Sequence, residues 1–410
     1  MARFLFVVPP LVGHVNPAVG VAAELTARGH EVAWAGHDEL LWQLAGPEAL
    51  VFSCAVPRDL PVRPAELKGP AALRFLWQDF LVPLADAMAP GVAAALAAFE
   101  PHVVVADQQA LAGGLLAEAA GLPWVTSATT SAELVDPLAG MPKVGEWVDA
   151  LLDGLRARIA GGRGVADPRF SPHGVLAFTT RELLGPATLP PSVRLVGPAL
   201  GARPATADFP WEWLDPLWHP GLRPGPGAPP PGTPEKRLRP TVLVSLGTAN
   251  TSAGAGFLTA TAEAFADLPA RAVIADPGGV LGDVPPNVLV RPQVPQLPLL
   301  PRVDAVLCHA GHNTVCEALW HGLPLVVAPI RDDQPIVAAQ VVAAGAGVRL
   351  RFGRANAPRI ATAVEEVLTE PSYRRAAETV AASFHAAGGS AAAAGHLEQL
   401  ALESLAHLAL

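Results

Sequence analysis

The sequence predicts an α/β protein of two doubly wound, Rossmann-like domains that face each other across a cleft. Continuous apolar strands alternate with helical segments along the chain, a pattern typical of parallel sheets covered on both faces. The alternation starts twice, at residues 4–8 and at residues 241–246. Between the two series, residues 201–240 are rich in proline and glycine and support neither a helix nor a central strand.

The length of 410 residues also favours two domains over one. We expect residues 1–200 to form the first domain and residues 241–410 the second, with residues 201–240 as the linker. A long surface loop inside one domain is the alternative for that stretch. The final helix is free to pack back on the first domain.

Strands and helices follow one another regularly in both halves. The first half predicts strands at residues 4–8, 31–34, 49–53, 102–106, 124–126 and 175–178, and helices at 17–28 and 71–99. The second predicts strands at residues 241–246, 272–275, 288–290, 305–308, 325–328 and 348–350, and helices at 255–268, 314–321, 335–344, 359–369 and from 373 onward. Because ligands of such sheets bind beyond the carboxyl ends of the strands, functional residues are expected there.

Composition excludes several classes of protein. Hydrophobic residues make up 51% and charged residues 16% of the chain, which excludes global disorder. A net charge of -9 without a lysine or arginine cluster argues against a nucleic-acid partner. Cys54, Cys308 and Cys316 have neither metal-ligand spacing nor an even disulfide framework, which favours a reduced, cytoplasmic setting. The opening apolar run is too short for a signal peptide or membrane span, and no later stretch is expected to cross a bilayer.

The richest motif follows the expected strand at residues 305–308. It contains a glycine turn and a helix start, where unpaired backbone N–H groups and the positive end of the helix dipole favour phosphate. Thr314 can add a hydroxyl donor there, and His309 an imidazole N–H. The alternative is a capping box, in which Thr314 and Glu317 only start the helix.

Two neighbouring strand ends carry similar groups. Asp333 and Gln334 follow the strand at residues 325–328, and a carboxylate beside a carboxamide suits sugar hydroxyls. The alternative makes Asp333 only the N-cap of the next helix. Ser245, Gly247 and Thr248 end the strand that begins at residue 241 with small and hydroxyl-bearing side chains.

A candidate catalytic base follows the first strand of the chain. Asn16 suits an N-cap and Pro17 the first helical position, which leaves His14 in a glycine-containing loop at the strand end. Its neutral imidazole could deprotonate an acceptor hydroxyl. Asp107, at the end of another strand, could fix the tautomer of that imidazole. The alternatives are a structural histidine and a helix cap before residues 110–120.

These motifs resemble those of a known enzyme family. This chain contains the pattern His309-x-Gly311-x-x-Thr314-x-x-Glu317-Ala318, Gly322-x-Pro324, Pro329 and Asp333-Gln334. The pattern resembles the donor-binding signature of family 1 glycosyltransferases with the GT-B fold. That family includes plant secondary-product enzymes and actinobacterial antibiotic glycosyltransferases. The loop from Gly13 to Pro17 resembles the family's catalytic-base motif, with Asp107 at the partner position, so the resemblance covers essentially the whole chain.

The resemblance implies a set of donor-binding residues. They are Ser245, Gly247, Thr248, Val294, His309, Gly311, His312, Asn313, Thr314, Glu317, Asp333 and Gln334. The residues around Thr314 would hold the diphosphate, Glu317 the ribose, and Asp333 with Gln334 the transferred sugar. The chain lacks the base-stacking tryptophan of plant members before its Pro-Gln, and has Val337 where the family often has asparagine. The nucleotide base, thymine or uracil, therefore stays open.

The implied activity is inverting sugar transfer without a metal or other cofactor. His14 would deprotonate the acceptor, which attacks the anomeric carbon as the nucleoside diphosphate leaves, with helix-end amides stabilising the charge. No Asp-x-Asp pair or metal-ligand spacing is present in the sequence. The resemblance to antibiotic enzymes favours a TDP-sugar over a UDP-sugar and a natural-product acceptor.

The acceptor pocket is expected in the first domain. Its candidate lining residues are Trp77, Phe80, Trp124, Met141 and Trp147. Together they favour an apolar, polycyclic or macrocyclic acceptor, although aromatic residues are also common in a core. Whether the new bond is to oxygen, nitrogen or carbon stays open, as does assembly into a homodimer.

Three other functions are alternatives to sugar transfer. A nucleotide-dependent dehydrogenase should carry Gly-x-Gly-x-x-Gly after the first strand, and this loop does not. A P-loop enzyme is excluded because its Gly-Lys-Ser/Thr motif is absent from the sequence. The remaining rival is a catalytically silent relative that binds and activates a partner glycosyltransferase.

Overall fold

The computed structural model describes residues 1–57, 67, 69–135, 140–164, 167–201, 208–214, 239–247 and 254–408. The chain forms two compact units. One comprises Met1–Pro204 and Phe384–Leu410, and the other comprises Ala205–Ser383. Most of the expected linker at residues 201–240 lies outside the described residues.

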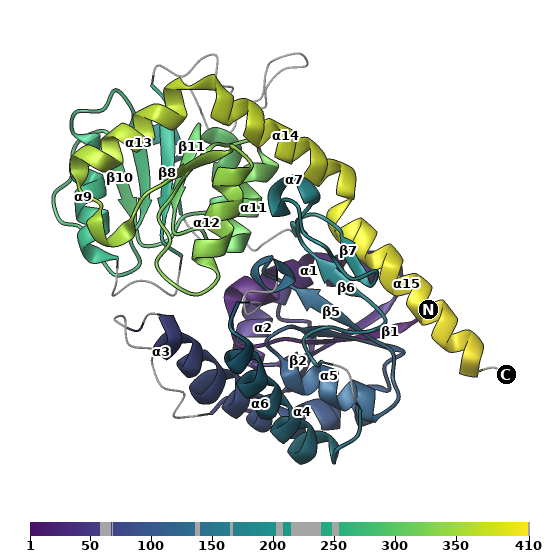
Figure 1. The fold of residues 1–410 in the computed structure, drawn as a ribbon. Coiled ribbons are helices and arrows are strands. Elements are labelled where there is room, and N and C mark those ends of the chain that lie inside the picture. Colours follow the sequence, from purple (N-terminus) through teal and green to yellow (C-terminus); the bar gives the residue numbers. More distant parts are fainter. Residues whose placement is uncertain are drawn as a thin grey trace, which may run out of the picture. The chain divides into compact units, whose positions relative to one another are not determined.

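The first unit contains one parallel sheet (Figure 1). Its strands are β1 (Arg3–Val7), β2 (Glu31–Gly36), β3 (Leu50–Ser53), β4 (Val103–Asp107), β5 (Trp124–Ala128), β6 (Val175–Ala177) and β7 (Val193–Leu195). Their order in the sheet is β3-β2-β1-β4-β5-β6-β7. The central strands β1, β4 and β5 are buried almost throughout, which explains their continuous apolar runs.

Helices cover both faces of this sheet. They are α1 (Val12–Ala27), α2 (Asp38–Ala45), α3 (Gly69–Arg74), the π-helix η1 (Phe75–Leu81), α4 (Val82–Phe99), α5 (Leu111–Ala119), η2 (Ala132–Val135), α6 (Pro142–Ala160), α7 (Arg181–Leu184) and α15 (Gly389–Leu408). Helices α1 and α15 bury apolar side chains on one face of the sheet, and α4 and α5 bury theirs on the other.

The second unit repeats the design with a six-stranded parallel sheet, ordered β10-β9-β8-β11-β12-β13. The strands are β8 (Thr241–Ser245), β9 (Arg271–Ala275), β10 (Val288–Arg291), β11 (Ala305–Cys308), β12 (Leu325–Val327) and β13 (Gly347–Arg349). The helices are α8 (Trp211–Leu214), α9 (Ala255–Phe265), α10 (Gln296–Leu299), η5 (Leu300–Arg302), α11 (His312–Trp320), α12 (Gln334–Ala343), η6 (Phe352–Arg354), α13 (Ala357–Thr369) and most of α14 (Pro371–Ala387). The predicted fold class, two parallel α/β sheets, is confirmed.

The last helix of the chain packs in the first unit. Glu398 of α15 accepts hydrogen bonds from Arg28 (2.6 Å) and His30 (2.8 Å). The Gly389 N–H donates to the Val196 carbonyl at 2.7 Å. Helix α15 also buries Leu397 beside the side chains of α1. These contacts fix α15 on the face of the sheet that carries α1.

The predicted start of the first helix is wrong. Helix α1 begins at Val12, with Leu11 as its N-cap, and Pro17 lies inside it. A proline there removes only one backbone hydrogen bond, to the residue four positions before it, and the helix forms despite that loss. His14 consequently lies on the first turn of α1, where the sequence predicted a loop.

One helix of the first unit is long and apolar enough to cross a bilayer, by length and composition alone. The prediction that no later stretch meets this criterion is therefore wrong. The continuous helix Gly69–Phe99 has 31 residues and a window of mean hydropathy 1.7. Its buried residues, among them Leu84, Met88 and Val92, pack in the core of the first unit. Of that apolar window, 33% is buried inside the structure.

Candidate active site

Two predicted residues of the first unit meet at the carboxyl edge of its sheet. Strands β1 and β4 are parallel neighbours, so the helix that follows β1 begins beside the end of β4. His14 Nδ1 lies 2.8 Å from Asp107 Oδ1. The Asp107 side chain is fully buried, whereas that of His14 is 17% exposed.

The hydrogen-bond network around Asp107 assigns the tautomer of His14. A carboxylate can only accept hydrogen bonds, so His14 carries its proton on Nδ1. Its Nε2 is then bare, which means that this nitrogen carries no proton. Asp107 Oδ1 also accepts from the Gln109 N–H at 2.8 Å. Helix α5 has Ala110 as its N-cap, so Asp107 does not cap it. A bare Nε2 on a buried carboxylate–imidazole pair is the arrangement of a general base.

Thr129 is a third member of this cluster that the sequence did not reveal. Its hydroxyl lies 2.7 Å from His14 Nδ1 and 3.0 Å from Asp107 Oδ2. Residues 126–131 contain five threonines and serines, and nothing in their spacing distinguishes one from the others. The signal is the sheet register, because Ser127 pairs with Asp107 and Thr129 follows two residues later, directly after the end of β5.

In the second unit, His309 is enclosed by two glycines. A Cβ built on Gly247 would stand 2.8 Å from His309 Cε1, and one built on Gly311 would collide with His309 Nε2. Gly247 also has a φ of +71°, which favours glycine. The turns after β8 and β11 can therefore close on the imidazole only with glycine at both positions.

Burial keeps His309 neutral. The side chain lies in a site with little solvent, and this burial lowers the pKa of His309 to about 4. A hydrogen bond to the Ser245 backbone acts in the opposite direction and raises the pKa. The positive charge of Arg331 lowers the same pKa further. Among the described residues, His309 Nδ1 has no hydrogen-bond partner although it is buried. One unsatisfied buried nitrogen is costly, so a ligand that bonds to it would gain affinity.

The start of helix α11 is not capped by a side chain. The N-cap of α11 is Gly311, and no side chain caps the helix there. Thr314 lies inside the first turn instead of at the N-cap, so the capping box of Thr314 and Glu317 does not form. A helix start of this kind carries backbone N–H groups and the positive end of the helix dipole, which suit an anion. The ring of His312 lies 3.5 Å from Cys316 Sγ, which leaves its backbone amide as its contribution at this helix start.

Glu317 makes a side-chain contact on the buried side of the same helix. Its Oε2 accepts a hydrogen bond of 2.6 Å from Gln296 Nε2. Glu317 is only 2% exposed. Gln296 begins α10, so the contact joins the loop that contains Val294 to α11. Gln296 was not among the predicted site residues; its signal in the sequence is its place at the end of Gln-Val-Pro-Gln.

Gln334 fixes the loop that follows β12. Its Oε1 accepts from the N–H groups of Ile330 (2.9 Å) and Arg331 (3.0 Å). Asp333 occupies the N-cap position of α12, yet its side chain makes no capping hydrogen bond. Arg331, which the sequence analysis did not single out, brings a cationic side chain near His309. Arg331 Nε lies 3.8 Å from Asp332 Oδ2, so the loop brings a guanidinium with a carboxylate beside it.

The remaining predicted residues are placed as follows. Ser245 ends β8 and accepts a weak hydrogen bond from the Gly247 N–H at 3.4 Å, and Asn313 lies in the first turn of α11. Thr248 lies outside the described residues. The described residues include no group of three His, Cys, Asp or Glu side chains placed to hold a metal ion.

Three of the five aromatic and methionine candidates for an acceptor pocket share one apolar cluster, and Trp124 and Met141 do not belong to it. Trp77 is buried in the cluster between α4, α5 and α6, with Phe80 and Trp147 partly buried around it. Trp124 is fully buried in a different cluster, beneath α4. Met141 is 42% exposed before α6. The structure thus gives Trp77 and Trp124 packing roles.

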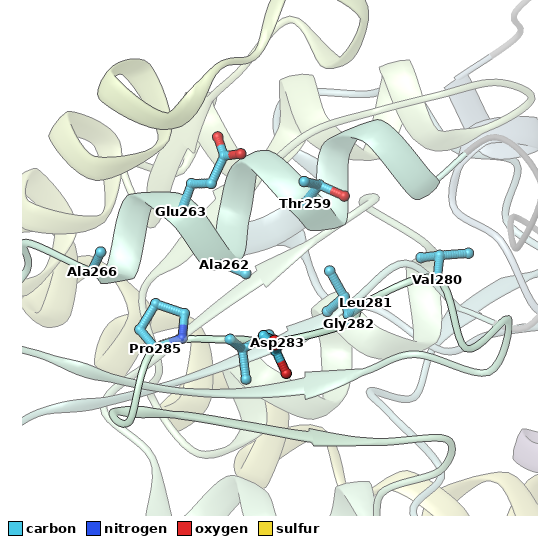
Figure 2. Close-up of a pocket in the computed structure, with 10 residues that line it drawn as sticks. Thr259, Ala262, Glu263, Ala266, Val280, Leu281, Gly282, Asp283 and Pro285 are labelled. Atoms are coloured by element: carbon cyan, nitrogen blue, oxygen red, sulfur yellow. The ribbon is translucent and has the colours of Figure 1, made fainter.

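A pocket of about 380 Å³ lies elsewhere in the second unit (Figure 2). It is lined by Thr259, Ala262, Glu263 and Ala266 of α9 and by residues 280–285. It contains none of the predicted site residues. Its carboxylates, Glu263 and Asp283, give it a charge that does not suit a phosphate ligand.

The fold and these two clusters define a class of protein. Each unit is a doubly wound α/β domain, one with a His–Asp pair at its sheet edge and the other with a helix start whose N-cap is Gly311. Such a protein is suited to transfer chemistry on a phosphate-bearing substrate.

Known proteins identify the family. The family model for UDP-glucoronosyl and UDP-glucosyl transferases matches residues 238–386. The chain is 31% identical to 4'-demethylrebeccamycin synthase of Lentzea aerocolonigenes, over 91% of this chain and 93% of that protein. It is also 31% identical to demethyllactenocin mycarosyltransferase of Streptomyces fradiae, over 98% and 87% of the two chains. The crystal structure of CalG4, the calicheamicin glycosyltransferase, aligns with a TM-score of 0.74 at 26% identity over 98% of both chains.

The chain therefore belongs to the family 1 glycosyltransferases with the GT-B fold, and it is a glycosyltransferase. Its relatives include glycosyltransferases of antibiotics. The predicted family, fold and enzyme class are confirmed. The individual site residues remain predictions that rest on the geometry given above.

The glycine enclosure of His309 leads to a first prediction. Gly311→Ala should lower the free energy of unfolding by about 1–3 kcal/mol, because the new methyl group overlaps the imidazole. Gly256→Ala is the matched control, since a Cβ there meets nothing within 4 Å. Urea unfolding of both variants measures the difference. Equal stabilities would contradict the enclosure.

The burial of His309 leads to a second prediction. An NMR titration should show its ring protonating near pH 4, with the signal assigned by its loss in His309→Asn. Because the folded-state pKa lies below the ordinary 6.5, His309 contributes stability that is present above pH 6.5 and is lost as the pH falls toward 4. A titration midpoint between pH 6 and 7 would show that the imidazole is solvated.

Proposed function

We propose that this chain is an inverting, metal-independent glycosyltransferase that moves a sugar from a nucleotide diphosphate sugar to an apolar natural-product acceptor. The observation that carries the proposal is the hydrogen bond between His14 and the buried carboxylate of Asp107. Membership of the family supplies the reaction class, and this pair supplies a base for it. We place the reaction in secondary-metabolite biosynthesis because relatives glycosylate antibiotics.

The acceptor step follows from the state of His14. Its bare Nε2 takes the proton of the acceptor group, and the negative charge of Asp107 stabilises the imidazolium that forms. The acceptor atom then forms a bond to the anomeric carbon from the side opposite the diphosphate. One displacement of this kind inverts the configuration at that carbon.

The donor step needs stabilisation of the leaving group. The bond from the anomeric carbon to the β-phosphate oxygen breaks, and its electron pair stays on the nucleoside diphosphate. The amides that start α11 and the Thr314 hydroxyl are donors suited to that charge. Arg331 adds a positive charge near His309. These groups support transfer without a metal or another cofactor.

The identity of the donor is the less constrained part of the proposal. A TDP-sugar is the first candidate because of the relatives that act on antibiotics. A UDP-sugar is the second, in line with the description of the family model. For the protein itself we propose a cytoplasmic location; its three cysteines are buried and free. We propose that the protein has no nucleic-acid partner.

A catalytically silent role as activator of a partner glycosyltransferase is the alternative. Such a protein has no need of a base, whereas this chain retains His14 on a buried carboxylate and a helix start without a side-chain cap. Release of nucleoside diphosphate from TDP-glucose and UDP-glucose, with a panel of hydroxylated polycyclic acceptors, separates the two. Turnover by the isolated chain supports the enzyme, and turnover only with a partner supports the activator.

His14→Ala tests the mechanism. The variant should lose about 10²–10⁴ of kcat, the usual contribution of a general base, while its affinity for the donor nucleotide stays unchanged. Product formation is measured by chromatography and nucleotide affinity by calorimetry. Wild-type turnover in His14→Ala would remove the proposed mechanism. Loss of nucleotide affinity in the same variant would instead indicate a disrupted fold.

A further inference from the structure

Thr129 contacts both members of the candidate catalytic pair. Its Oγ1 lies 2.7 Å from His14 Nδ1 and 3.0 Å from Asp107 Oδ2. The residue is only 4% exposed. Thr129 therefore cannot bind a substrate from solvent directly, and any effect on the reaction must pass through the two side chains it touches.

The protons of the cluster can be assigned from its acceptors. A threonine hydroxyl has one proton and two lone pairs, and a carboxylate has only lone pairs. The Thr129 proton goes to Asp107 Oδ2, because a charged acceptor is preferred over a neutral one. A lone pair of Thr129 Oγ1 is then left for the Nδ1–H of His14, which it shares with Asp107 Oδ1.

We propose that Thr129 is a positioning residue that holds the His14–Asp107 pair in the geometry of a general base. The inference rests on the function proposed above. By binding Oδ2, Thr129 fixes the rotation of the carboxylate, so that Oδ1 faces the imidazole. By accepting from Nδ1–H, the same oxygen fixes the rotation of the ring and directs the bare Nε2 away from Asp107.

The sheet places this hydroxyl accurately. Asp107 and Ser127 are register partners on β4 and β5, and Thr129 follows two residues later, directly after the end of β5. Threonine is branched at Cβ, so few side-chain rotamers are available to it and little entropy is lost on ordering. Serine keeps the hydroxyl without that restriction, whereas valine keeps the shape without the hydroxyl.

The test compares Thr129→Val, Thr129→Ser and a control. Thr129→Val should lower kcat about tenfold, the usual effect of losing a hydrogen bond to a charged group, with KM for donor and acceptor unchanged. Thr129→Ser should restore most of kcat. The control is Thr26→Val, which removes a hydroxyl at the other end of α1, bonded only to its own helix at Ala22.

A double-mutant cycle separates positioning from a purely structural role. In the His14→Ala background, Thr129→Val should cost less than twofold in kcat, because the residue that it positions is gone. A tenfold loss in both backgrounds would overturn the proposal. An unchanged kcat in Thr129→Val with wild-type His14 would overturn it as well.

One readout does not depend on activity. The Nδ1–H resonance of His14, assigned by its loss in His14→Ala, should move in Thr129→Val and return to its place in Thr129→Ser. If the wild-type chain transfers no sugar, the proposed function fails, and this resonance still decides whether Thr129 shares the Nδ1 proton. An unmoved resonance in Thr129→Val would contradict the contact itself.

Discussion

Parallel strand pairing is the constraint on which the rest of the structure depends. In both sheets every described pair is parallel, so all strands of a unit end at one edge and the following turns gather there. This pairing brings His14, Asp107 and Thr129 together although they are far apart in sequence. In the second unit it sets the turn after β8 against His309, which follows β11.

Burial gives the two histidines different chemical roles. His14 is partly exposed and lies on a carboxylate, so it can take a proton and be stabilised as a cation. His309 is enclosed between glycines, and burial with a nearby guanidinium lowers its pKa to about 4. A histidine of that kind stays neutral at pH 7 and carries one N–H and one lone pair. We therefore propose a base in the first unit and a neutral imidazole in the second.

The sequence predicted the strands of both sheets within about two residues at each end, apart from β7, because burial on both faces leaves continuous apolar runs. The start of α1 was mispredicted because Pro17 is usual at a helix start, and tertiary packing overrode that preference. Thr129 was missed because only strand register selects it from a run of hydroxyl residues. The acceptor candidates Trp77, Phe80 and Trp147 share a cluster with core residues, and a core tryptophan and a pocket tryptophan look alike in sequence.

We propose that the start of α11, with His309 beside it, binds a nucleoside diphosphate without a metal. Calorimetric titration with TDP and, separately, UDP in the presence of EDTA tests it most directly, with Thr314→Val as the site variant and Thr362→Val of α13 as its control. We expect saturable binding of at least one nucleotide to the wild type, about tenfold weaker in Thr314→Val and unchanged in Thr362→Val. No binding of either nucleotide to the wild-type chain would contradict the account.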